Sequence, residues 1–279
     1  MKKLLLALLA LCLTTSLFAF SSCGKKDDPS VITVGASPTP HAEILNVVKE
    51  ELKKQGYTLK IVEFNDYFLP NEGVESGELL ANYFQHQPYL DDYNKNNGTH
   101  ITSVASVHYE PFALYGSSAY SSLSALKSAV DGGTKVKISI PNDGSNEARA
   151  LFLLQENGFL TLKAGTGFTA TKQDIATCPQ NLEIVEMEAG LLPNTVKGKD
   201  VAAAVINGNY AISSGLSIKN ALAKEKNDSA AATTYANIIA VKQGNENDPR
   251  VKALVSALKS QAVKDYIAAT YGGGVVALF

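Results

Sequence analysis

The sequence predicts an α/β protein of two lobes, each a mainly parallel β-sheet flanked by helices. Three observations support this prediction. Short runs of β-branched and apolar residues recur as strands, amphipathic helical patterns separate them, and the series begins again near residue 135. Strands that alternate with helices of this length are typical of βαβ units. Two such lobes are expected to hold a ligand in a cleft between them, where loops at the carboxyl ends of the strands meet.

The first residues, 1–22, predict a secretory signal peptide. Two lysines precede the apolar run 4–13, which is shorter than the roughly 20 residues that span a bilayer. Two serines then lead into Cys23, and a polar leash, 23–30, follows. The residues before Cys23 resemble a bacterial lipobox, although phenylalanine stands where leucine is usual. This implies a lipid anchor at Cys23, with palmitate among its acyl chains, on the extracytoplasmic side of the envelope membrane. The alternative is an ordinary signal peptide cut elsewhere.

Cysteine content and charge exclude other classes. After the signal only Cys23 and Cys178 remain, so no disulfide framework is available and a hydrophobic core must stabilise the chain. The 25 Lys and Arg against 27 Asp and Glu give a net charge of −2, and loss of the two signal lysines leaves −4. Without a long basic run, we expect no nucleic-acid partner.

The elements of the first lobe lie at both ends of the mature chain. Residues 31–35 and 58–64 predict strands, and the apolar residues of 44–52 recur at helical spacing between them. Near the end, 237–242 predicts a strand and 251–267 carries a helical stripe that we expect in the core.

The second lobe repeats the pattern. Strands are predicted at 135–140, 182–187 and 201–206, and a helix at 145–157 ends at Gly158. We therefore predict that the first lobe comprises residues 31–112 and 241–279 and that the second lobe comprises residues 113–240.

Two junctions between a strand and a helix combine aromatic rings with polar groups. They read FNDYFLPNE at 64–72 and LANYFQHQPYL at 80–90, where Pro88 suits the first turn of a helix. Loops of this composition favour a binding site. The alternative is a structural role, in the core or at a helix cap, for Phe64, Asp66, Phe68, Asn71 and His86.

These junctions resemble the methionine-binding lipoproteins that serve ABC importers. Further matches are HYEP at 108–111, IPND at 140–143, NEAR at 146–149, LLQ at 153–155 and AVIN at 204–207. The resemblance covers most of the mature chain. It implies a two-lobed fold like that of periplasmic binding proteins, amino-acid transport with methionine as the ligand, and a separate membrane permease and cytoplasmic ATPase as partners. No cofactor is implied.

The segment 141–149 leaves a strand and opens a helix that Asp143 or Ser145 is placed to cap. Free N–H groups at such a terminus attract anions, and Arg149 can add a bidentate grip on a ligand carboxylate. The alternative for Arg149 is an ion pair with Glu147 or another carboxylate.

An α-amino group needs acceptors. Asn207 follows the predicted strand 201–206 and can present its side-chain oxygen to the cleft; in the similar proteins an asparagine at this point contacts the ligand. Asn146 and Glu110 are further candidate acceptors. A cap on the helix that follows is the alternative for Asn207, and the two roles are compatible.

The apolar part of the ligand is expected between aromatic rings. The candidates are Tyr67, Phe84, His86 and His108. A thioether packs well against ring edges, contributing on the order of 0.3 to 1.5 kcal/mol per contact, but leucine would fit as well. Selectivity for sulfur is therefore implied by the resemblance alone.

The rival from another class is an exported hydrolase that uses carboxylates and histidines. The sequence has no G-x-S-x-G elbow, no H-E-x-x-H helix and no Walker-type loop, and His86 and His108 lack a third local ligand. We therefore predict neither an enzyme nor a metal site. Other ligands remain open: a methionine dipeptide, another amino acid, an organic anion or a thiamine-like molecule. A non-transport surface lipoprotein is a further alternative.

Overall fold

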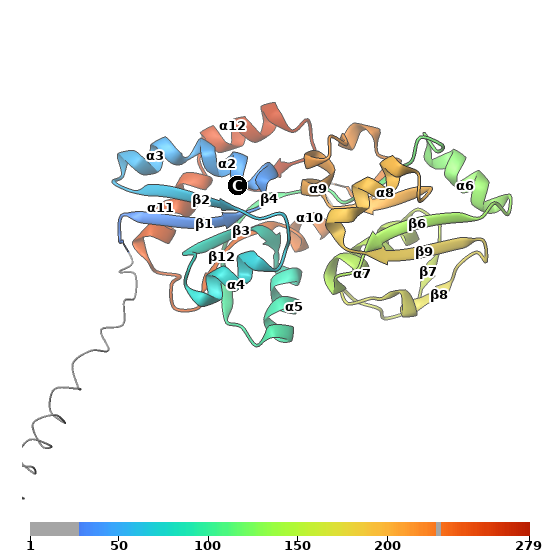
Figure 1. Ribbon diagram of the computed structural model, residues 1–279, viewed down its shortest axis with the longest axis horizontal. Helices are drawn as coiled ribbons and strands as arrows, with labels where there is room; N and C mark the ends of the chain where they lie inside the picture. Colours follow the sequence, from blue (N-terminus) through green and yellow to red (C-terminus); the bar gives the residue numbers. More distant parts are fainter. Residues whose placement is uncertain (1–27, 227–229) are drawn as a thin grey trace, which may run out of the picture.

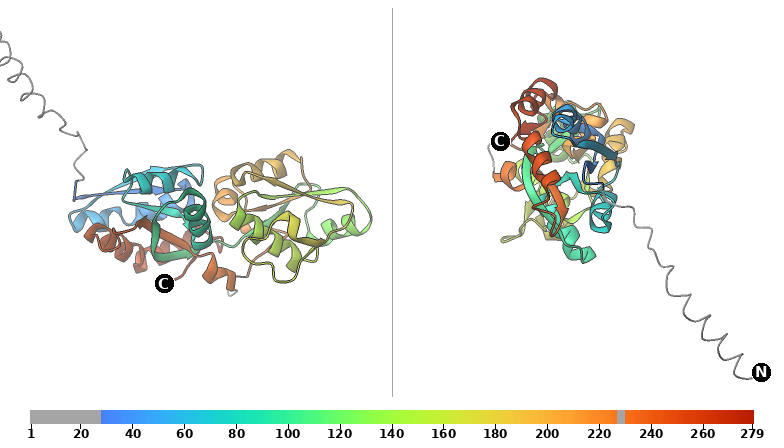
Figure 2. Two further views of the ribbon diagram at one scale, coloured as in Figure 1. Left: turned by 90° about the horizontal axis from the view of Figure 1, so that it is seen from below. Right: turned by 90° about the vertical axis from the view of Figure 1, so that its left-hand side faces the viewer.

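The protein consists of two α/β bodies that lie side by side (Figures 1 and 2). The computed structural model describes residues 28–226 and 230–279, so the predicted signal peptide and Cys23 lie outside it. We call the body around the six-stranded sheet lobe 1 and the body around the five-stranded sheet lobe 2. The predicted two-lobed α/β fold is confirmed. Within the described ranges, no helix is long and apolar enough to span a membrane.

The sheet of lobe 1 combines strands from both ends of the chain. Its strands are β1 (Val31–Ala36), β2 (Thr58–Glu63), β3 (Ala81–His86), β4 (Ile101–Tyr109), β12 (Asn237–Lys242) and β13 (Val276–Ala277). The order is β13-β4-β12-β3-β1-β2. β1 is parallel to β2 and β3, whereas β12 is antiparallel to β3 and β4, so the sheet is mixed. β12 runs away from lobe 2 because the chain enters it on returning from that lobe.

Helices cover both faces of this sheet. They are η1 (Pro38–Ala42), α2 (Glu43–Val47), α3 (Lys49–Lys54), α4 (Leu69–Ser76), α5 (Gln87–Asn97), α11 (Pro249–Leu258) and α12 (Gln261–Thr270). On one face α2, α3, α11 and α12 pack in the larger core, which confirms the helical stripes predicted at 44–52 and 251–267. On the other face α4 and α5 pack in a smaller core. Neighbouring residues of β12 alternate between the two: Ile239 joins the first core and Ile238 the second.

Lobe 2 has the same layered design. Its sheet, in the order β11-β5-β10-β6-β9, consists of β5 (Ala113–Gly116), β6 (Val136–Pro141), β9 (Leu182–Met187), β10 (Ala203–Ile206) and β11 (Ala223–Lys224). β6 is parallel to β9 and β10, and β5 is antiparallel to β10 and β11.

Helices also cover both faces of the lobe 2 sheet. The remaining elements are α6 (Leu123–Asp131), α7 (Gly144–Glu156), α8 (Leu192–Gly198), α9 (Gly208–Ser213), α10 (Ala230–Thr234), the hairpin β7 (Thr161–Leu162) and β8 (Ile175–Thr177), and the short turns η2 (Lys172–Asp174), η3 (Ala189–Leu191) and η4 (Ile218–Asn220). Side chains of α6 and α7 pack on one face of the sheet, and those of α8 and α9 on the other.

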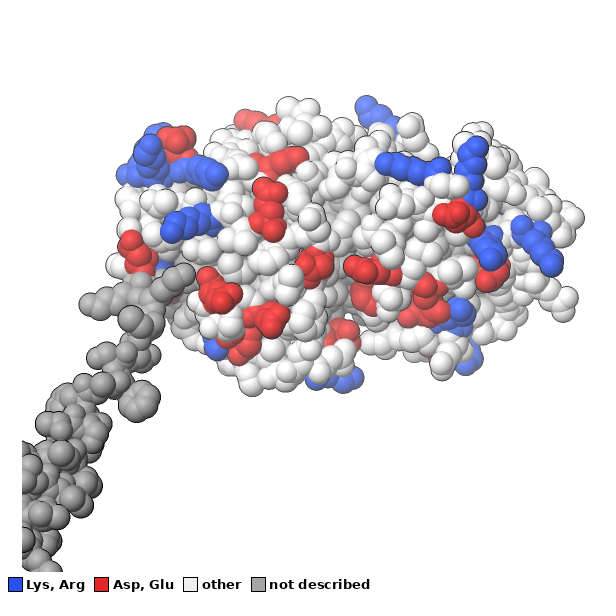
Figure 3. All heavy atoms as spheres, viewed as in Figure 1, with Lys and Arg blue, Asp and Glu red and all other residues white. Residues whose placement is uncertain are grey.

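The chain crosses between the lobes twice, from β4 to β5 and from β11 to β12. β12 begins at Asn237, so residues 237–240 belong to the sheet of lobe 1, although the sequence analysis assigned them to the second lobe. The pairing that decides this joins β12 to strands far earlier in the chain, which local periodicity cannot reveal. Both crossings run past the carboxyl ends of the parallel strands. On the face drawn in Figure 3, acidic side chains lie where the lobes meet, and Lys and Arg lie toward the outer ends.

Candidate ligand-binding cleft

A small cavity lies between the lobes. Its wall is formed by Tyr67, Phe84, Gln85, His86, Tyr89, Glu110, Asn146, Arg149, Asn207, Gly208, Asn209 and Asn237. Lobe 1 contributes residues from the end of β3 and the start of α5, and lobe 2 contributes the first turns of α7 and α9. The cavity therefore occupies the place that parallel α/β sheets offer to ligands.

His86 occupies the point where β3 passes into α5. Its Nδ1 accepts a hydrogen bond from the backbone N–H of Tyr89 at 3.2 Å and so caps the helix. The proton of the neutral ring must then lie on Nε2, which is 3.2 Å from Oδ1 of Asn146 in the opposite lobe. Burial, with the Arg149 cation nearby, lowers the pKa of His86 to about 3. His86 is a neutral donor at physiological pH.

At the start of α7 the polar groups bond mainly to one another. Asp143 caps the helix, accepting hydrogen bonds from the backbone N–H of Asn146 at 3.0 Å and from its Nδ2 at 2.8 Å. The helix terminus predicted to attract an anion is therefore already occupied by a carboxylate. Oδ1 of Asn146 also accepts a bond from Nδ2 of Asn207 at 2.9 Å. The Oδ1 atom of Asn146 thus accepts hydrogen bonds from His86 and Asn207, and it orients both side chains.

Asn207 leaves one acceptor unsatisfied. Although it stands at the N-cap position of α9, its side chain makes no capping bond. Its Oδ1 is buried without a hydrogen-bond partner among the described residues. A buried acceptor in that state costs about 1 to 3 kcal/mol, and a donor brought by a ligand would relieve this cost.

Arg149 is buried, with 4% of its surface exposed, and its main partner is Glu225. Nε donates to Glu225 Oε1 at 2.9 Å and Nη2 to Oε2 at 2.6 Å, and Nη2 also reaches the backbone oxygen of Glu110 at 2.9 Å. Burial disfavours the guanidinium charge, but the Glu225 carboxylate outweighs it and raises the pKa of Arg149. Nη1 meets no acceptor in the described ranges. One nitrogen, Nη1 with its two N–H groups, therefore remains as a donor, not the bidentate edge that the sequence predicted.

Aromatic rings surround this ion pair. The Arg149 guanidinium carbon lies 4.3 Å from the ring centre of Tyr235 and 4.8 Å from that of Phe112. The hydroxyl of Tyr109 donates to Glu225 at 2.6 Å. These contacts exclude water and fix the guanidinium, which preorganises its remaining donor.

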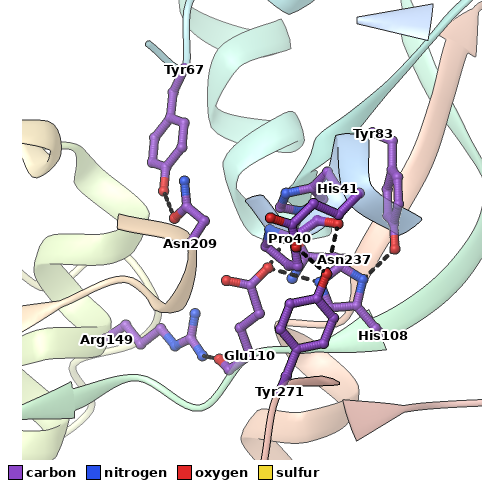
Figure 4. Close-up of polar contacts among 11 residues, drawn as sticks. Pro40, His41, Tyr67, Tyr83, His108, Glu110, Arg149, Asn209, Asn237 and Tyr271 are labelled. Carbon is purple, nitrogen blue, oxygen red and sulfur yellow. Dashed lines mark hydrogen bonds and ion pairs between the residues drawn. The ribbon is translucent and has the colours of Figure 1, made fainter. Parts of the chain in front are cut away.

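A second group of rings forms the apolar wall of the cavity. The centre of the Tyr67 ring lies 5.8 Å from that of Phe84, 5.7 Å from Tyr89 and 5.0 Å from Tyr210. The Tyr67 hydroxyl crosses to lobe 2 and donates to Asn209 Oδ1 at 2.6 Å (Figure 4). This wall is therefore also a contact between the lobes.

Two polar residues of the segment 64–72, Asp66 and Asn71, have a structural role and not a ligand-binding one. Asp66 accepts hydrogen bonds from the backbone N–H groups of Phe68 and Leu69, both at 2.8 Å. Asn71 is fully buried and bonds to Gln85 at 2.9 Å, beneath the cavity wall. Neither residue lines the cavity.

Glu110 lies at the first crossing, in front of a buried polar cluster (Figure 4). Its Oε1 is 2.8 Å from Nε2 of His108 and 3.4 Å from Nε2 of His41. His41 also contacts Asn237 Oδ1 at 2.9 Å, and the Tyr83 hydroxyl bonds to His108 Nδ1. Burial lowers the pKa of His41 to about 4 and that of His108 to about 3. Burial also raises the pKa of Glu110, an effect that His41 and Arg149 oppose.

The structure brings together seven of the eight predicted ligand-binding residues. Tyr67, Phe84, His86, Glu110, Asn146, Arg149 and Asn207 line the cavity. His108 does not, because it lies behind Glu110 with its side chain fully buried.

Several residues that contribute to the site were not predicted from the sequence. Tyr89 was within a quoted motif and Asn209 lies two residues after Asn207, so both were within reach of motif reasoning. Glu225 and His41 lie outside the sequence motifs described above. A buried arginine requires a carboxylate partner, but only the fold identifies which one.

Comparisons with known proteins agree with this architecture. Residues 32–279 match the family model described as NlpA lipoprotein. The membrane lipoprotein TpN32 of Treponema pallidum is 43% identical, covering 92% of this chain and 91% of its own. The methionine-binding lipoprotein MetQ of Bacillus subtilis is 37% identical, covering 99% and 98%. A solved nutrient-binding protein of Burkholderia cenocepacia, bound to methionine, is 43% identical with a TM-score of 0.81, covering 89% and 100%. The chain belongs to the NlpA lipoprotein family.

Proposed function

We propose that this protein captures a free amino acid, L-methionine, in the cleft between its lobes and delivers it to an ABC importer. The observation that carries the proposal is the buried Asn207 Oδ1, an acceptor without a partner among the described residues, on the wall of a polar and aromatic cavity. Buried acceptors in proteins are nearly always satisfied, so a ligand that brings a donor is expected here.

The amino group of the ligand would bind Asn207 and Glu110. Oε2 of Glu110 lies beside Gly208 on the cavity wall, where a Cβ atom at that glycine would come within 2.6 Å of it. A carboxylate oxygen and an amide oxygen together suit an ammonium group, which has three donors and no acceptor.

The carboxylate would accept a hydrogen bond from Nη1 of Arg149, and the side chain would pack against Tyr67, Phe84 and Tyr89. Thioether contacts with ring edges contribute on the order of 0.3 to 1.5 kcal/mol each. Leucine-like side chains gain most of the same contacts, so the choice of methionine rests on the relatives whose names specify it.

The polar groups of the cavity favour binding over catalysis. Its wall contains no serine, cysteine or lysine side chain within the described residues. His86, whose pKa of about 3 is far below neutrality, is a weak general base there. The protein would therefore release its ligand unchanged, to a permease and ATPase encoded by other chains. A lipid on Cys23 would hold it at the outer side of the membrane.

The test begins with small molecules released when the full-length protein, purified in detergent, is denatured. Mass spectrometry of the released fraction should detect methionine. After removal of that ligand, a thermal-shift series with the twenty amino acids should give its largest shift with L-methionine, because a ligand at a hundredfold excess over Kd stabilises by about 2.7 kcal/mol. Folded protein that releases no amino acid and shifts with none would contradict the proposal.

A further inference from the structure

The two carboxylate oxygens of Glu110 have different surroundings. Oε1 points into the buried cluster, where the Nε2 atoms of His108 and His41 lie at 2.8 and 3.4 Å. Oε2 faces Gly208 on the cavity wall. The absence of a side chain at Gly208 permits this close approach of α9 to the carboxylate. Oε1 is thus held by His108, and Oε2 has no side-chain hydrogen-bond partner among the described residues.

The hydrogen-bond network fixes which nitrogen of each ring carries the proton. Burial raises the pKa of the Tyr83 hydroxyl, so it remains protonated and donates to Nδ1 of His108. His108 then carries its proton on Nε2 and donates to Glu110. Nε2 of His41 faces only acceptors, the oxygens of Asn237 and Glu110, so it also carries the proton. His108 therefore donates to Oε1 of Glu110, whereas the single N–H of neutral His41 is donated to Asn237 at 2.9 Å, with Oε1 3.4 Å away.

A metal ion is the other chemistry that two histidines and a glutamate can serve. The donor atoms of His41, His108 and Glu110 lie within 4.8 Å of one another. Coordination through both Nε2 atoms would move a proton of each ring to Nδ1, and a metal-bound histidine almost always donates that proton to an acceptor. Nδ1 of His41 is buried and has no partner among the described residues. The network therefore favours hydrogen bonds over a metal.

We infer that His41 and His108 are positioning residues, which hold Glu110 as a charged carboxylate with Oε2 directed at the amino group of the ligand. They would not touch the ligand themselves. The His108 donor stabilises the charge on Oε1 directly, and the N–H of His41, which is bonded to Asn237 and lies 3.4 Å from Oε1, adds a weaker contribution. Neither ring neutralises the carboxylate, because both rings are uncharged. This inference rests on the proposed function and explains how the cleft selects ligands that carry an amino group.

The inference predicts a change in the pH profile. The groups that face Glu110 are His41 from η1, His108 from β4, Arg149 from α7, the backbone N–H of Asn209 from α9, and, through the histidines, Tyr83 and Asn237. Burial raises the pKa of Glu110, while His41, Arg149 and the Asn209 N–H lower it. Binding requires the ionised form, so affinity falls as pH drops through this pKa. Loss of a histidine donor raises the pKa and moves the fall in affinity to higher pH.

The experiment compares L-methionine with its desamino analogue, 4-(methylthio)butanoate, by calorimetric titration of the full-length protein. His108→Leu should weaken L-methionine binding by about tenfold to a hundredfold, the value of a hydrogen bond to a charged group. His41→Leu should weaken it by less, and both substitutions should change analogue binding by about twofold or less. His41→Gln keeps an N–H near Nε2 and should recover most of the loss. The exposed His100, mutated to Leu, is the matched control and should leave both affinities unchanged.

Coupling to Glu110 separates positioning from a merely structural role. In a Glu110→Gln background the histidine substitutions should have little further effect on L-methionine affinity, because the residue they act through has lost its charge. Equal loss of both ligands in the folded histidine variants, full additivity with Glu110→Gln, or stoichiometric metal in the purified protein would each overturn the inference. Failure of the wild type to bind L-methionine would instead contradict the proposed function.

Discussion

The two polar ends of the cavity handle charge in opposite ways. At one end Arg149 is paired with Glu225 inside the protein, so a ligand carboxylate bound as proposed would meet a guanidinium whose charge is already balanced. At the other end, within the described residues, the side chains that contact the Glu110 carboxylate are two neutral histidines, so no paired cation balances it. Under the proposed binding mode, the carboxylate end would recognise its ligand mainly by geometry, whereas the amine end would recognise it by charge.

The largest expected effect concerns stability at the paired end. Glu225→Ala leaves the buried Arg149 charge without its partner and should lower the free energy of unfolding by about 3 to 5 kcal/mol. Glu183→Ala, which removes an exposed ion pair with Lys137, is the control and should cost less than about 1 kcal/mol. Denaturant unfolding of both variants measures the difference. Equal, small effects would mean that Arg149 is not held by Glu225, and the comparison of the two ends would fail.

The next effect concerns affinity at the amine end. Asn207→Ala removes the unsatisfied acceptor and should weaken L-methionine binding by about 1 to 3 kcal/mol while costing little stability. Asn157→Ala removes an asparagine that bonds within lobe 2, to the Leu153 carbonyl, and should leave affinity unchanged. Titration calorimetry with a thermal melt checks both. Unaltered affinity in Asn207→Ala would remove Asn207 from the amine end.

A smaller effect follows from crowding at the same end. The Cβ atom of Gly208→Ala would lie 2.6 Å from Oε2 and 2.7 Å from Cβ of Glu110, so the carboxylate must shift. We expect L-methionine affinity to fall by about 1 to 2 kcal/mol, the lower part of the range for overpacking. Gly167→Ala, with nothing within 4 Å of the added atom, is the control. An affinity equal to that of the wild type would show that Glu110 need not hold its present position.

The smallest effect concerns the aromatic wall. Tyr67→Phe keeps the ring but loses the bond to Asn209 that links the lobes, and should speed ligand release by a factor that corresponds to about 0.5 to 1.5 kcal/mol. Stopped-flow fluorescence of release measures it. If Tyr67→Phe speeds the release of methionine but not of the analogue without an amino group, Tyr67 would act on the amino group of the ligand and not on the contact between the lobes.

Local signals predicted most elements, and strands at Leu182–Met187 and Asn237–Lys242 agree with the predicted bounds. The assignment of residues 237–240 of the second strand to lobe 2 was wrong, because the strands that pair with β12 are distant in sequence. At the site, residues at strand ends were predictable because β3 of lobe 1 and β6 and β10 of lobe 2 all end near the cleft between the lobes. Glu225 lies near the second crossing without any motif, so its pairing with Arg149 became visible only in three dimensions.

The most direct test of the contrast between the two ends is one titration series on wild-type protein with L-methionine, its desamino analogue and methioninamide. Methioninamide neutralises the carboxylate but keeps an oxygen that can accept from Arg149 Nη1. We predict that loss of the amino group weakens binding at least about tenfold more than amidation does, since the former removes a charge-assisted bond. A greater loss on amidation than on deamination would contradict the account.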